Sequence, residues 1–258
     1  MKKDRIVVKV GSNVLTREDG SPDITMISSI VDQIVGLREK GYDVILVTSG
    51  AVACGRRLLK HTGKMDEVEQ RQLFSAMGQV RLINLYFSLF RDYGYNIGQV
   101  LTMKESFSTK RQYQNQKGCM EIMLRNGVIP IVNENDTVCV TELMFTDNDE
   151  LSGLVAEMMG AHTLIILTNV DGLYDGDPGE EGSEVIRRIL PGEDISCHIA
   201  SSKSSRGRGG MKSKCTTAAS VAAKGVRVVI ANGRRENIIT DIMDRPDEAV
   251  FTEFVPAV

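Results

Sequence analysis

Residues 6–11 read IVVKVG, and this stretch sets the expected fold. Residues 6–10 are a nearly continuous apolar run that stops at a glycine, which is the pattern of a strand buried on both faces of a parallel sheet. Lys9 is the exception within the run. A lysine is costly to bury in such a strand unless its ammonium group emerges at a site, so we expect Lys9 to reach a ligand.

The rest of the chain alternates similar apolar runs with helical periodicity. Residues 24–37 carry apolar side chains at helical spacing, between Asp23 as a cap and Gly41 as a stop. Further strands are expected at residues 44–47, 96–101, 128–132, 164–167 and 226–230, an edge strand at 249–254, and further helices at 69–92, 110–125, 147–159 and 216–224. This alternation predicts an α/β fold, a three-layer αβα sandwich around a mostly parallel central sheet, as a single domain over residues 1–258.

The composition argues against bulk nucleic-acid or membrane binding. The formal net charge is −3, and no apolar run approaches the ~18 residues that span a bilayer. The five cysteines (Cys54, Cys119, Cys139, Cys197 and Cys215) are scattered without a C-x-x-C pair, which is typical of reduced thiols in a cytosolic protein. We therefore expect a cytoplasmic protein that binds neither nucleic acid nor membranes.

Residues 207–214 read GRGGMKSK and form a candidate phosphate site. Three glycines and two lysines precede an expected helix, so backbone N–H groups and ammonium groups would meet at its N-terminus. Neither G-x-x-x-x-G-K-[ST] nor a G-x-G-x-x-G after a strand occurs in the chain. If this segment binds phosphate, it therefore does so through neither of these two motifs. The alternative interpretation is a solvated basic loop without a phosphate site.

Polar clusters follow the expected strands. They are Gly11-Ser12, Thr48-Ser49-Gly50, the NEND of residues 133–136 and Thr168-Asn169, and the DND of residues 147–149 heads a helix. Ligands of open α/β sheets bind beyond the carboxyl ends of the strands, so these clusters predict one shared site. The carboxylates of residues 147–149 could equally be simple helix caps.

Several segments, in this order, resemble the amino acid kinase superfamily over about residues 6–231: VVKVGSNVLT, LVTSGAVACGR, VIPIVNENDTV, FTDNDELS, LTNVDGLYDGDP and GRGGMKSK. VNEND, FTDND, and TSGA followed by GR are similar to the branch that phosphorylates the γ-carboxylate of L-glutamate. The resemblance implies transfer from ATP, with Mg²⁺, to give L-glutamyl 5-phosphate, the first step of proline biosynthesis. A carboxylate is already ionised at neutral pH, so no catalytic histidine is required.

The resemblance also implies a role for individual residues. Lys9 and Lys214 would stabilise the transferring phosphoryl group, and Asp149 would orient them. Asp136 would pair with the substrate ammonium, while Ser49 and Asn148 would hydrogen-bond its carboxylates. The ATP-binding residues would be Lys9, Gly11, Thr168, Asn169, Gly209, Gly210, Met211 and Lys214. Mg²⁺ would be held by phosphate oxygens, with no protein ligand assigned.

The chain departs from the family pattern at Arg208, where relatives more usually have a small hydroxyl residue. Of the two lysines in GRGGMKSK, we expect Lys214 and not Lys212 to act on the phosphoryl group. Many bacterial relatives continue into a small C-terminal PUA domain, which we expect to be missing here. The family further implies homodimers or homotetramers, feedback inhibition by L-proline, and handover of the labile product to a glutamyl phosphate reductase.

Four other functions stay open. In an acetylglutamate kinase or aspartokinase the acceptor differs, and an acylated nitrogen would leave Asp136 without an ammonium group to pair with. A uridylate kinase would place a phosphorylated acceptor beside the acidic NEND and DND loops, which disfavours it. A non-catalytic amino-acid sensor would be expected to lose Lys9, Lys214 or Asp149, and all three are present.

Overall fold

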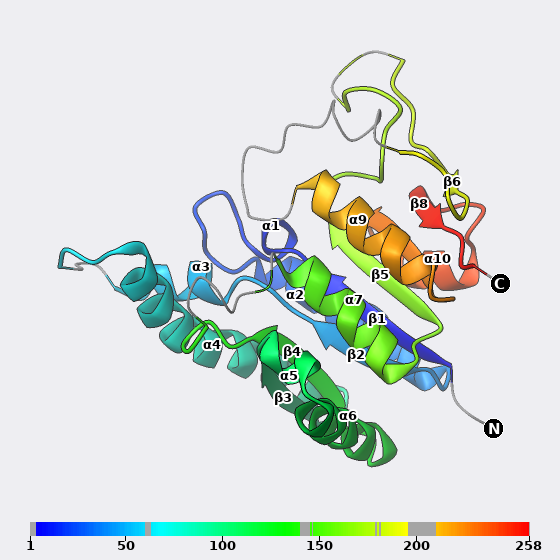
Figure 1. Ribbon diagram of the computed structural model, residues 1–258. Coiled ribbons are helices and arrows are strands. Elements are labelled where there is room, and N and C mark those ends of the chain that lie inside the picture. The colour runs from blue at the N-terminus through cyan, green and yellow to red at the C-terminus, as the bar shows by residue number, and fades with distance from the viewer. Residues whose placement is uncertain are drawn as a thin grey trace.

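The computed structural model describes residues 4–59, 63–139, 145, 147–178, 180, 182–195 and 210–257. Their strands form one eight-stranded sheet in the order β3-β4-β2-β1-β5-β7-β8-β6 (Figure 1). The six parallel strands are β1 (Arg5–Val10), β2 (Asp43–Val47), β3 (Ile97–Thr102), β4 (Ile129–Glu134), β5 (Thr163–Thr168) and β7 (Arg227–Asn232). β8 (Phe251–Phe254) runs antiparallel to β7, and the short β6 (Arg188–Ile189) pairs with β8.

The predicted first strand lies at the centre of this sheet. All six residues of β1 are buried, and β1 pairs on one side with β2 and on the other with β5. Lys9 is opposite Val47 in one neighbour and Ile166 in the other, near the carboxyl end of all three strands. The central position explains why the strand reads as apolar throughout, and it delivers Lys9 to the edge where ligands of such sheets bind.

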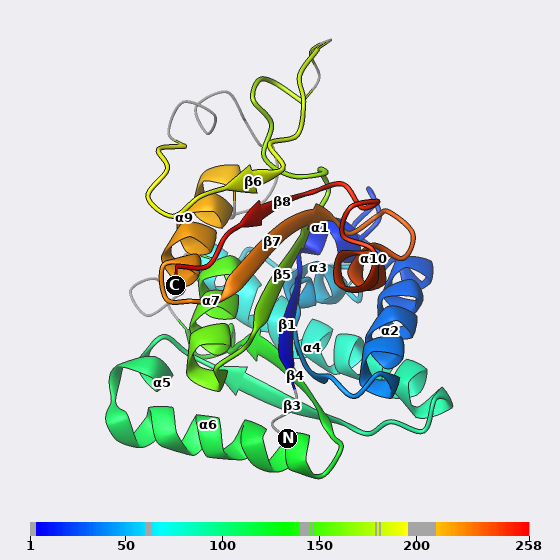
Figure 2. The same cartoon turned by 90° about the vertical axis from the view of Figure 1, so that its right-hand side faces the viewer.

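Helices cover both faces of the sheet, as Figure 2 shows, so the predicted three-layer αβα sandwich is confirmed. On one face lie α2 (Ile24–Glu39), α4 (Glu67–Asp92) and α10 (Ile238–Asp244), and on the other α6 (Lys110–Arg125), α7 (Asn148–Met159) and α9 (Met211–Ala222). Three short helices lie nearer the strand ends: α1 (Ser12–Leu15), α3 (Ala51–Arg56) and α5 (Glu105–Ser108). Each face has its own buried apolar cluster.

Three features of the expected fold that bear on the site or the sheet order differ from the structure. The helix expected from residue 216 begins at Met211, so Lys214 lies in its first turn and not in a loop. β4 runs on to Glu134, which places half of the NEND segment on a strand. The strand expected at the sheet edge, β8, lies between β7 and β6. The edge prediction was wrong because β6 is only two residues long and leaves no periodic signal.

The packing of α3 against α4 positions part of the site. A Cβ atom at Gly55 would overlap the backbone oxygen of Phe74, and one at Gly78 would overlap the backbone oxygen of Ala51. The two helices therefore touch backbone to backbone. Gly50, just before α3, has φ +92°, a conformation that favours glycine, and it turns the chain from β2 into α3.

Among the described residues, no helix combines the length and the apolar character needed to cross a membrane.

Candidate functional site

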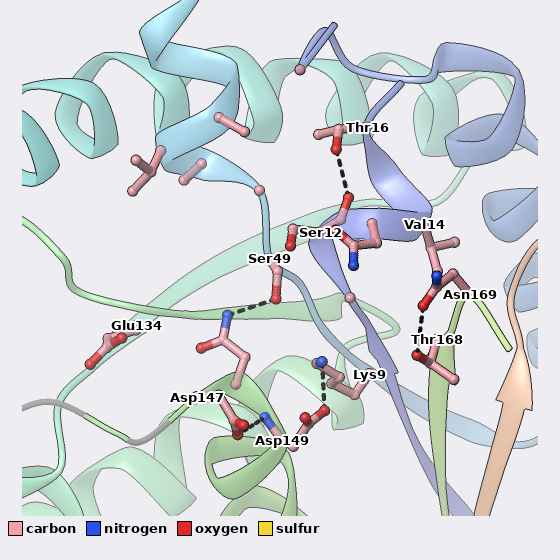
Figure 3. Close-up of a pocket in the computed structure, with 18 of the residues that line it drawn as sticks. Lys9, Ser12, Val14, Thr16, Ser49, Glu134, Asp147, Asp149, Thr168 and Asn169 are labelled. Carbon is pink, nitrogen blue, oxygen red and sulfur yellow. Dashed lines mark hydrogen bonds and ion pairs between the residues drawn. The ribbon is translucent and has the colours of Figure 1, made fainter. Parts of the chain in front are cut away.

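A cavity of about 1310 Å³ opens beyond the carboxyl ends of β1, β2, β4 and β5. Figure 3 shows side chains from several elements converging on it, with Lys9 and Asp149 facing each other, Ser49 on one side of them, and Thr168 and Asn169 on another. The predicted site residues that line it are Lys9, Gly11, Ser49, Asp136, Asn148, Asp149, Thr168, Asn169, Met211 and Lys214. Gly210, the N-cap of α9, does not line this cavity, and Gly209 and Arg208 fall outside the described residues.

Two lysines share one buried carboxylate in the wall of the cavity. Nζ of Lys9 lies 2.6 Å from Oδ1 of Asp149, and Nζ of Lys214 lies 2.9 Å from Oδ2. The Asp149 side chain is fully buried, and the two lysines are only 4% and 7% exposed. Burial acts to raise the pKa of Asp149, but the two ammonium groups outweigh it, and the pKa is lowered from its ordinary value. Two ammonium groups and one carboxylate leave a single net positive charge.

Asp147, the first residue of the DND segment, is a helix cap. Oδ1 of Asp147 accepts hydrogen bonds from the backbone N–H groups of Asp149 and Glu150, at 2.9 and 3.1 Å, so Asp147 is the cap of α7. The cap fixes the first turn of α7 and therefore the direction of Asn148 and Asp149. The alternative that all these carboxylates are caps is correct for Asp147 and does not hold for Asp149.

Asn148 and Ser49 are brought together, as predicted. Nδ2 of Asn148 donates to the backbone oxygen of Thr48 at 2.8 Å, to Oγ of Ser49 at 3.0 Å and to Oδ1 of Asn133 at 2.9 Å. Its two amide hydrogens are thus shared among three acceptors within the protein, so no separate donor of Asn148 is left for a substrate carboxylate in this arrangement. Asn148 instead has Oδ1, an acceptor, to offer to the cavity. The hydroxyl of Ser49 accepts from Asn148 and keeps its own hydrogen for donation.

Asp136 lies beside an arginine that the sequence did not single out. Nε of Arg71, on α4, donates to Oδ1 of Asp136 at 2.7 Å, and a second guanidinium nitrogen pairs with Asp136 and with Oε2 of Glu134. The other oxygen of Glu134 accepts from the backbone N–H of Phe145 at 3.0 Å. Arg71, Glu134 and Asp136 all line the cavity. Arg71 belongs to no sequence motif, so the sequence gave no indication that it contacts Glu134, which lies 63 residues away at the end of β4.

Gly11, Thr168 and Asn169, which are expected to bind nucleotide, lie at the ends of β1 and β5, whereas Met211 and Lys214 reach the cavity from α9. The backbone N–H of Gly11 donates to the backbone oxygen of Leu167 at 3.1 Å, and a Cβ at Gly11 would come within 3.6 Å of Nζ of Lys9. The backbone oxygen of Thr168 accepts from the N–H of Gly233 at 2.8 Å. These bonds tie the ends of β1, β5 and β7 together under the cavity.

A second ion pair holds the turn after β5. Asp171 accepts from two nitrogens of Arg235, at 2.6 and 2.7 Å, and from Nδ2 of Asn232 at 3.0 Å. The hydrogen bond from Arg235 is the main cause of the lowered pKa of Asp171. The pair joins the segment after β5 to the segment after β7, and sequence spacing alone gave no sign of it.

A metal site made of protein side chains alone is not present in the described part of the chain, where no three His, Cys, Asp or Glu residues gather in a suitable arrangement. The cavity instead supplies the ammonium groups of Lys9 and Lys214, which suit oxygen atoms of an anionic ligand.

Comparison with known proteins agrees with this geometry. A model of the amino acid kinase family matches residues 4–232. The chain belongs to the amino acid kinase family. Within the family it is similar to glutamate 5-kinases. That of Bacteroides thetaiotaomicron is 58% identical over 253 residues, with 98% of this chain and 70% of that protein covered. That of Chlorobaculum tepidum is 47% identical, with 92% of this chain and 66% of that protein covered.

Two solved kinase structures of low sequence identity share the fold. Carbamate kinase from Giardia lamblia, bound to AMP-PNP, superposes with a TM-score of 0.70 at 15% identity, covering 99% of both chains. UMP kinase from Ureaplasma parvum superposes with a TM-score of 0.64 at 19% identity, covering 99% of this chain and all of that one. At such identities the likeness confirms the amino acid kinase fold and says nothing of the substrate.

Proposed function

We propose that this chain is a glutamate 5-kinase, which transfers the γ-phosphoryl group of ATP to the γ-carboxylate of L-glutamate. The product is L-glutamyl 5-phosphate, the first intermediate of proline biosynthesis. The observation that carries the proposal is the pair of buried ammonium groups on Asp149, at the wall of a cavity that also holds Ser49, Asn148 and Asp136. The glutamate 5-kinases at 58% and 47% identity support the same assignment.

The reaction needs charge stabilisation more than proton transfer. An oxygen of the γ-carboxylate forms a bond to the γ-phosphorus, and the bond from that phosphorus to the oxygen of the leaving ADP breaks. The carboxylate is ionised at neutral pH, so it needs no general base. Lys9 and Lys214 carry one net positive charge beyond that of Asp149, and they would face the negative charge spread over the transferring group. Asp149 would keep both ammonium groups in place before the substrates bind.

The amino-acid substrate would be held at the other end of the cavity. Asp136 and Oδ1 of Asn148 are acceptors and would take the substrate ammonium group. The hydroxyl of Ser49 is a donor and would take a substrate carboxylate. On this assignment the site would require a free amino group, since an N-acylated substrate brings neither the charge nor three N–H donors.

The nucleotide would bind between the ends of β1 and β5 and the start of α9. Lys9, Gly11, Thr168, Asn169, Gly209, Gly210, Met211 and Lys214 are the residues that we assign to ATP. Bound Mg²⁺ neutralises phosphate charge, and phosphate oxygens would supply most of its ligands.

Four further properties belong to the proposal by family relationship. The enzyme would act as a homodimer or homotetramer, L-proline would inhibit it at the glutamate site, and a glutamyl phosphate reductase would consume the labile product. The reaction would take place in the cytoplasm, where free thiols such as those of Cys54, Cys119, Cys139 and Cys215 persist.

A hydroxamate-trapping assay tests the proposed reaction. The enzyme is incubated with ATP, Mg²⁺ and hydroxylamine together with L-glutamate, N-acetyl-L-glutamate or L-aspartate. Hydroxylamine captures an acyl phosphate, so the signal reports transfer to a carboxylate and not ATP hydrolysis. We expect hydroxamate with L-glutamate. A signal with one of the other acceptors alone would move the chain to a sibling activity, and no signal at all would favour a sensor.

A further inference from the structure

A buried glutamine on α4 contacts the amino-acid end of the cavity through one intermediate residue. Oε1 of Gln79 lies 2.9 Å from Nδ2 of Asn133, on β4. The two side chains are 9% and 2% exposed. Asn133 lines the cavity, and Gln79 lies behind it. Oδ1 of Asn133 in turn accepts from Nδ2 of Asn148, so the three amides form a chain from α4 to the cavity.

Two backbone groups fix which amide atom donates and which accepts in each hydrogen bond between Gln79, Asn133 and Asn148. The backbone N–H of Glu134 donates to Asn133 at 2.9 Å, and an N–H can only donate, so the atom that receives it must be the amide oxygen. The backbone oxygen of Thr48 lies 2.8 Å from the amide of Asn148, and a carbonyl can only accept, so the atom facing it must be Nδ2. Neither amide can be turned over without opposing two donors or two acceptors.

This fixed direction determines what Asn148 offers to a ligand. Its Nδ2 hydrogens are used by Thr48, Ser49 and Asn133, and Oδ1 is the atom left for the cavity. An amide oxygen accepts from an ammonium group and cannot bind a carboxylate. The nitrogen of Asn133 that points away from the cavity needs an acceptor of its own, and Gln79 supplies it.

We propose that Gln79 is a positioning residue that sets the preference of the site for a substrate with a free amino group. It holds Asn133, Asn133 holds the nitrogen of Asn148, and Asn148 thereby presents its oxygen to the cavity that Asp136 also lines. The inference rests on the proposed function, because it concerns how the same site recognises L-glutamate.

Replacing Gln79 by a residue without an acceptor removes the hydrogen bond at the buried end of this series of three amides. In Gln79→Met the side chain keeps nearly the same length, but Nδ2 of Asn133 loses its acceptor inside the protein. Asn133 then keeps only the contacts of its oxygen with the backbone N–H of Glu134 and with Asn148, and its amide shifts toward another acceptor. Asn148 keeps its bond to the backbone oxygen of Thr48, but the Asn133 oxygen that helps to hold its amide is displaced, so its own oxygen is less firmly positioned. A ligand with an ammonium group then meets a poorly positioned acceptor, whereas a ligand without one is little affected.

The test compares L-glutamate with glutarate, which has both carboxylates and no amino group. The values of KM and kcat are measured for each by hydroxamate trapping, with glutarate also tested as a competitive inhibitor. For Gln79→Met we expect KM for L-glutamate to rise roughly tenfold, which corresponds to about 1.4 kcal/mol, with kcat nearly unchanged. The KM or inhibition constant of glutarate should stay within about twofold of the wild-type value.

Two further variants complete the design. Gln79→Glu keeps an acceptor for Asn133 and should retain most of the preference for L-glutamate. Gln33→Met is the matched control, because Gln33 is a buried glutamine of α2 that accepts from the backbone N–H of Ile239 at 2.8 Å and does not line the cavity. It should lower the melting temperature and leave the preference unchanged. If Gln79→Met fails to fold, Gln79→Asn withdraws the same acceptor without adding an apolar group, and the same result is expected.

The outcomes separate this inference from the proposed function. A wild-type enzyme without hydroxamate from L-glutamate would overturn the proposed function itself. A wild-type enzyme that is active with L-glutamate, together with a Gln79→Met variant that weakens both ligands equally or neither, would overturn the role of Gln79 alone.

Discussion

Nε of Arg71 lies 2.7 Å from Oδ1 of Asp136, so the carboxylate that we assign to the substrate ammonium is itself held by a side chain of α4. A second nitrogen of the same guanidinium group reaches Glu134 at 2.8 Å. One positive charge thus lies between two carboxylates at the end of β4. The helix that carries Gln79 also carries Arg71, and α4 therefore helps to shape the whole amino-acid end of the cavity.

Replacing Arg71 should weaken the binding of L-glutamate more than it slows catalysis. In Arg71→Met, Asp136 and Glu134 repel each other without a cation between them, and Asp136 turns from its present position. We expect KM for L-glutamate to rise at least roughly tenfold, since a hydrogen bond to a charged group contributes about 1.5–3 kcal/mol. Steady-state kinetics with saturating ATP measures it, and kcat should fall by less than about threefold.

The double variant with Asp136→Ala provides the control for Arg71. Asp136→Ala alone should raise KM for L-glutamate. Adding Arg71→Met should raise KM little further, because the carboxylate that Arg71 holds in place is already absent. If the two effects multiplied instead, Arg71 would act independently of Asp136. Arg71→Lys should fall between the wild type and Arg71→Met, since a lysine keeps the charge without the two-pronged geometry.

Asp149→Asn should destabilise the fold strongly, because it leaves two buried ammonium groups without their carboxylate. The loss in free energy of unfolding at pH 7 should be about 3–5 kcal/mol. The pKa of Asp149 is lowered from its ordinary value of 3.8, so its stabilising effect is complete above that pH and is lost as the pH falls through the lowered pKa. The difference between wild type and variant should therefore be constant above about pH 5 and should shrink below pH 3.8.

Urea unfolding over a pH series measures this difference. Asp241→Asn is a suitable control, because Asp241 pairs with a half-exposed Arg245 on the surface and should change stability by less than about 1 kcal/mol. A variant Asp149→Asn as stable as the wild type at pH 7 would mean that the lysines are neutral or hydrated, and would contradict the charge assignment of the site.

Gly78→Ala should separate α3 from α4. The added Cβ would overlap the backbone oxygen of Ala51, and backbone atoms cannot move aside as a flexible side chain can. We expect a loss of roughly 3 kcal/mol or more in the free energy of unfolding and a higher KM for L-glutamate, since Ser49 precedes α3 and Arg71 lies on α4. Gly118→Ala on α6 meets no atom within 4 Å and should stabilise the protein by roughly 0.5–1 kcal/mol. Thermal and urea unfolding of both variants make the comparison.

Local pattern was sufficient for most of the fold. The continuous apolar run of β1 predicted a central buried strand, and the caps Asp23 and Gly41 predicted the bounds of α2. The start of α9 could not be predicted, because residues 211–215 read MKSKC and carry no apolar periodicity. Lys214 nevertheless lies within that helix and is buried, since Asp149 compensates its charge.

Which residues converge on the cavity was predictable where they lie in short motifs and not where they depend on long-range contacts. Lys9, Ser49, Asn148 and Asp149 could be named because they lie near the end of a strand, follow one or head a helix, within recognisable segments. Arg71 and Gln79 could not, because both are ordinary residues of a long helix, and their partners lie 63–65 and 54 residues along the chain. Likewise, the sequence named Asn148 but could not say which of its amide atoms faces the cavity.

The most direct test of the central claim is the kcat of hydroxamate formation from L-glutamate by Lys9→Met, at saturating ATP and L-glutamate. Lys214 still neutralises Asp149 in this variant, so the fold should persist, and circular dichroism can confirm it. We predict a fall in kcat of roughly 10²–10³-fold, because one of the two charges facing the phosphoryl group is gone. Lys224→Met, at an exposed ion pair of Lys224 with Glu157 outside the cavity, should keep wild-type activity. A folded Lys9→Met enzyme with near wild-type kcat would contradict the account.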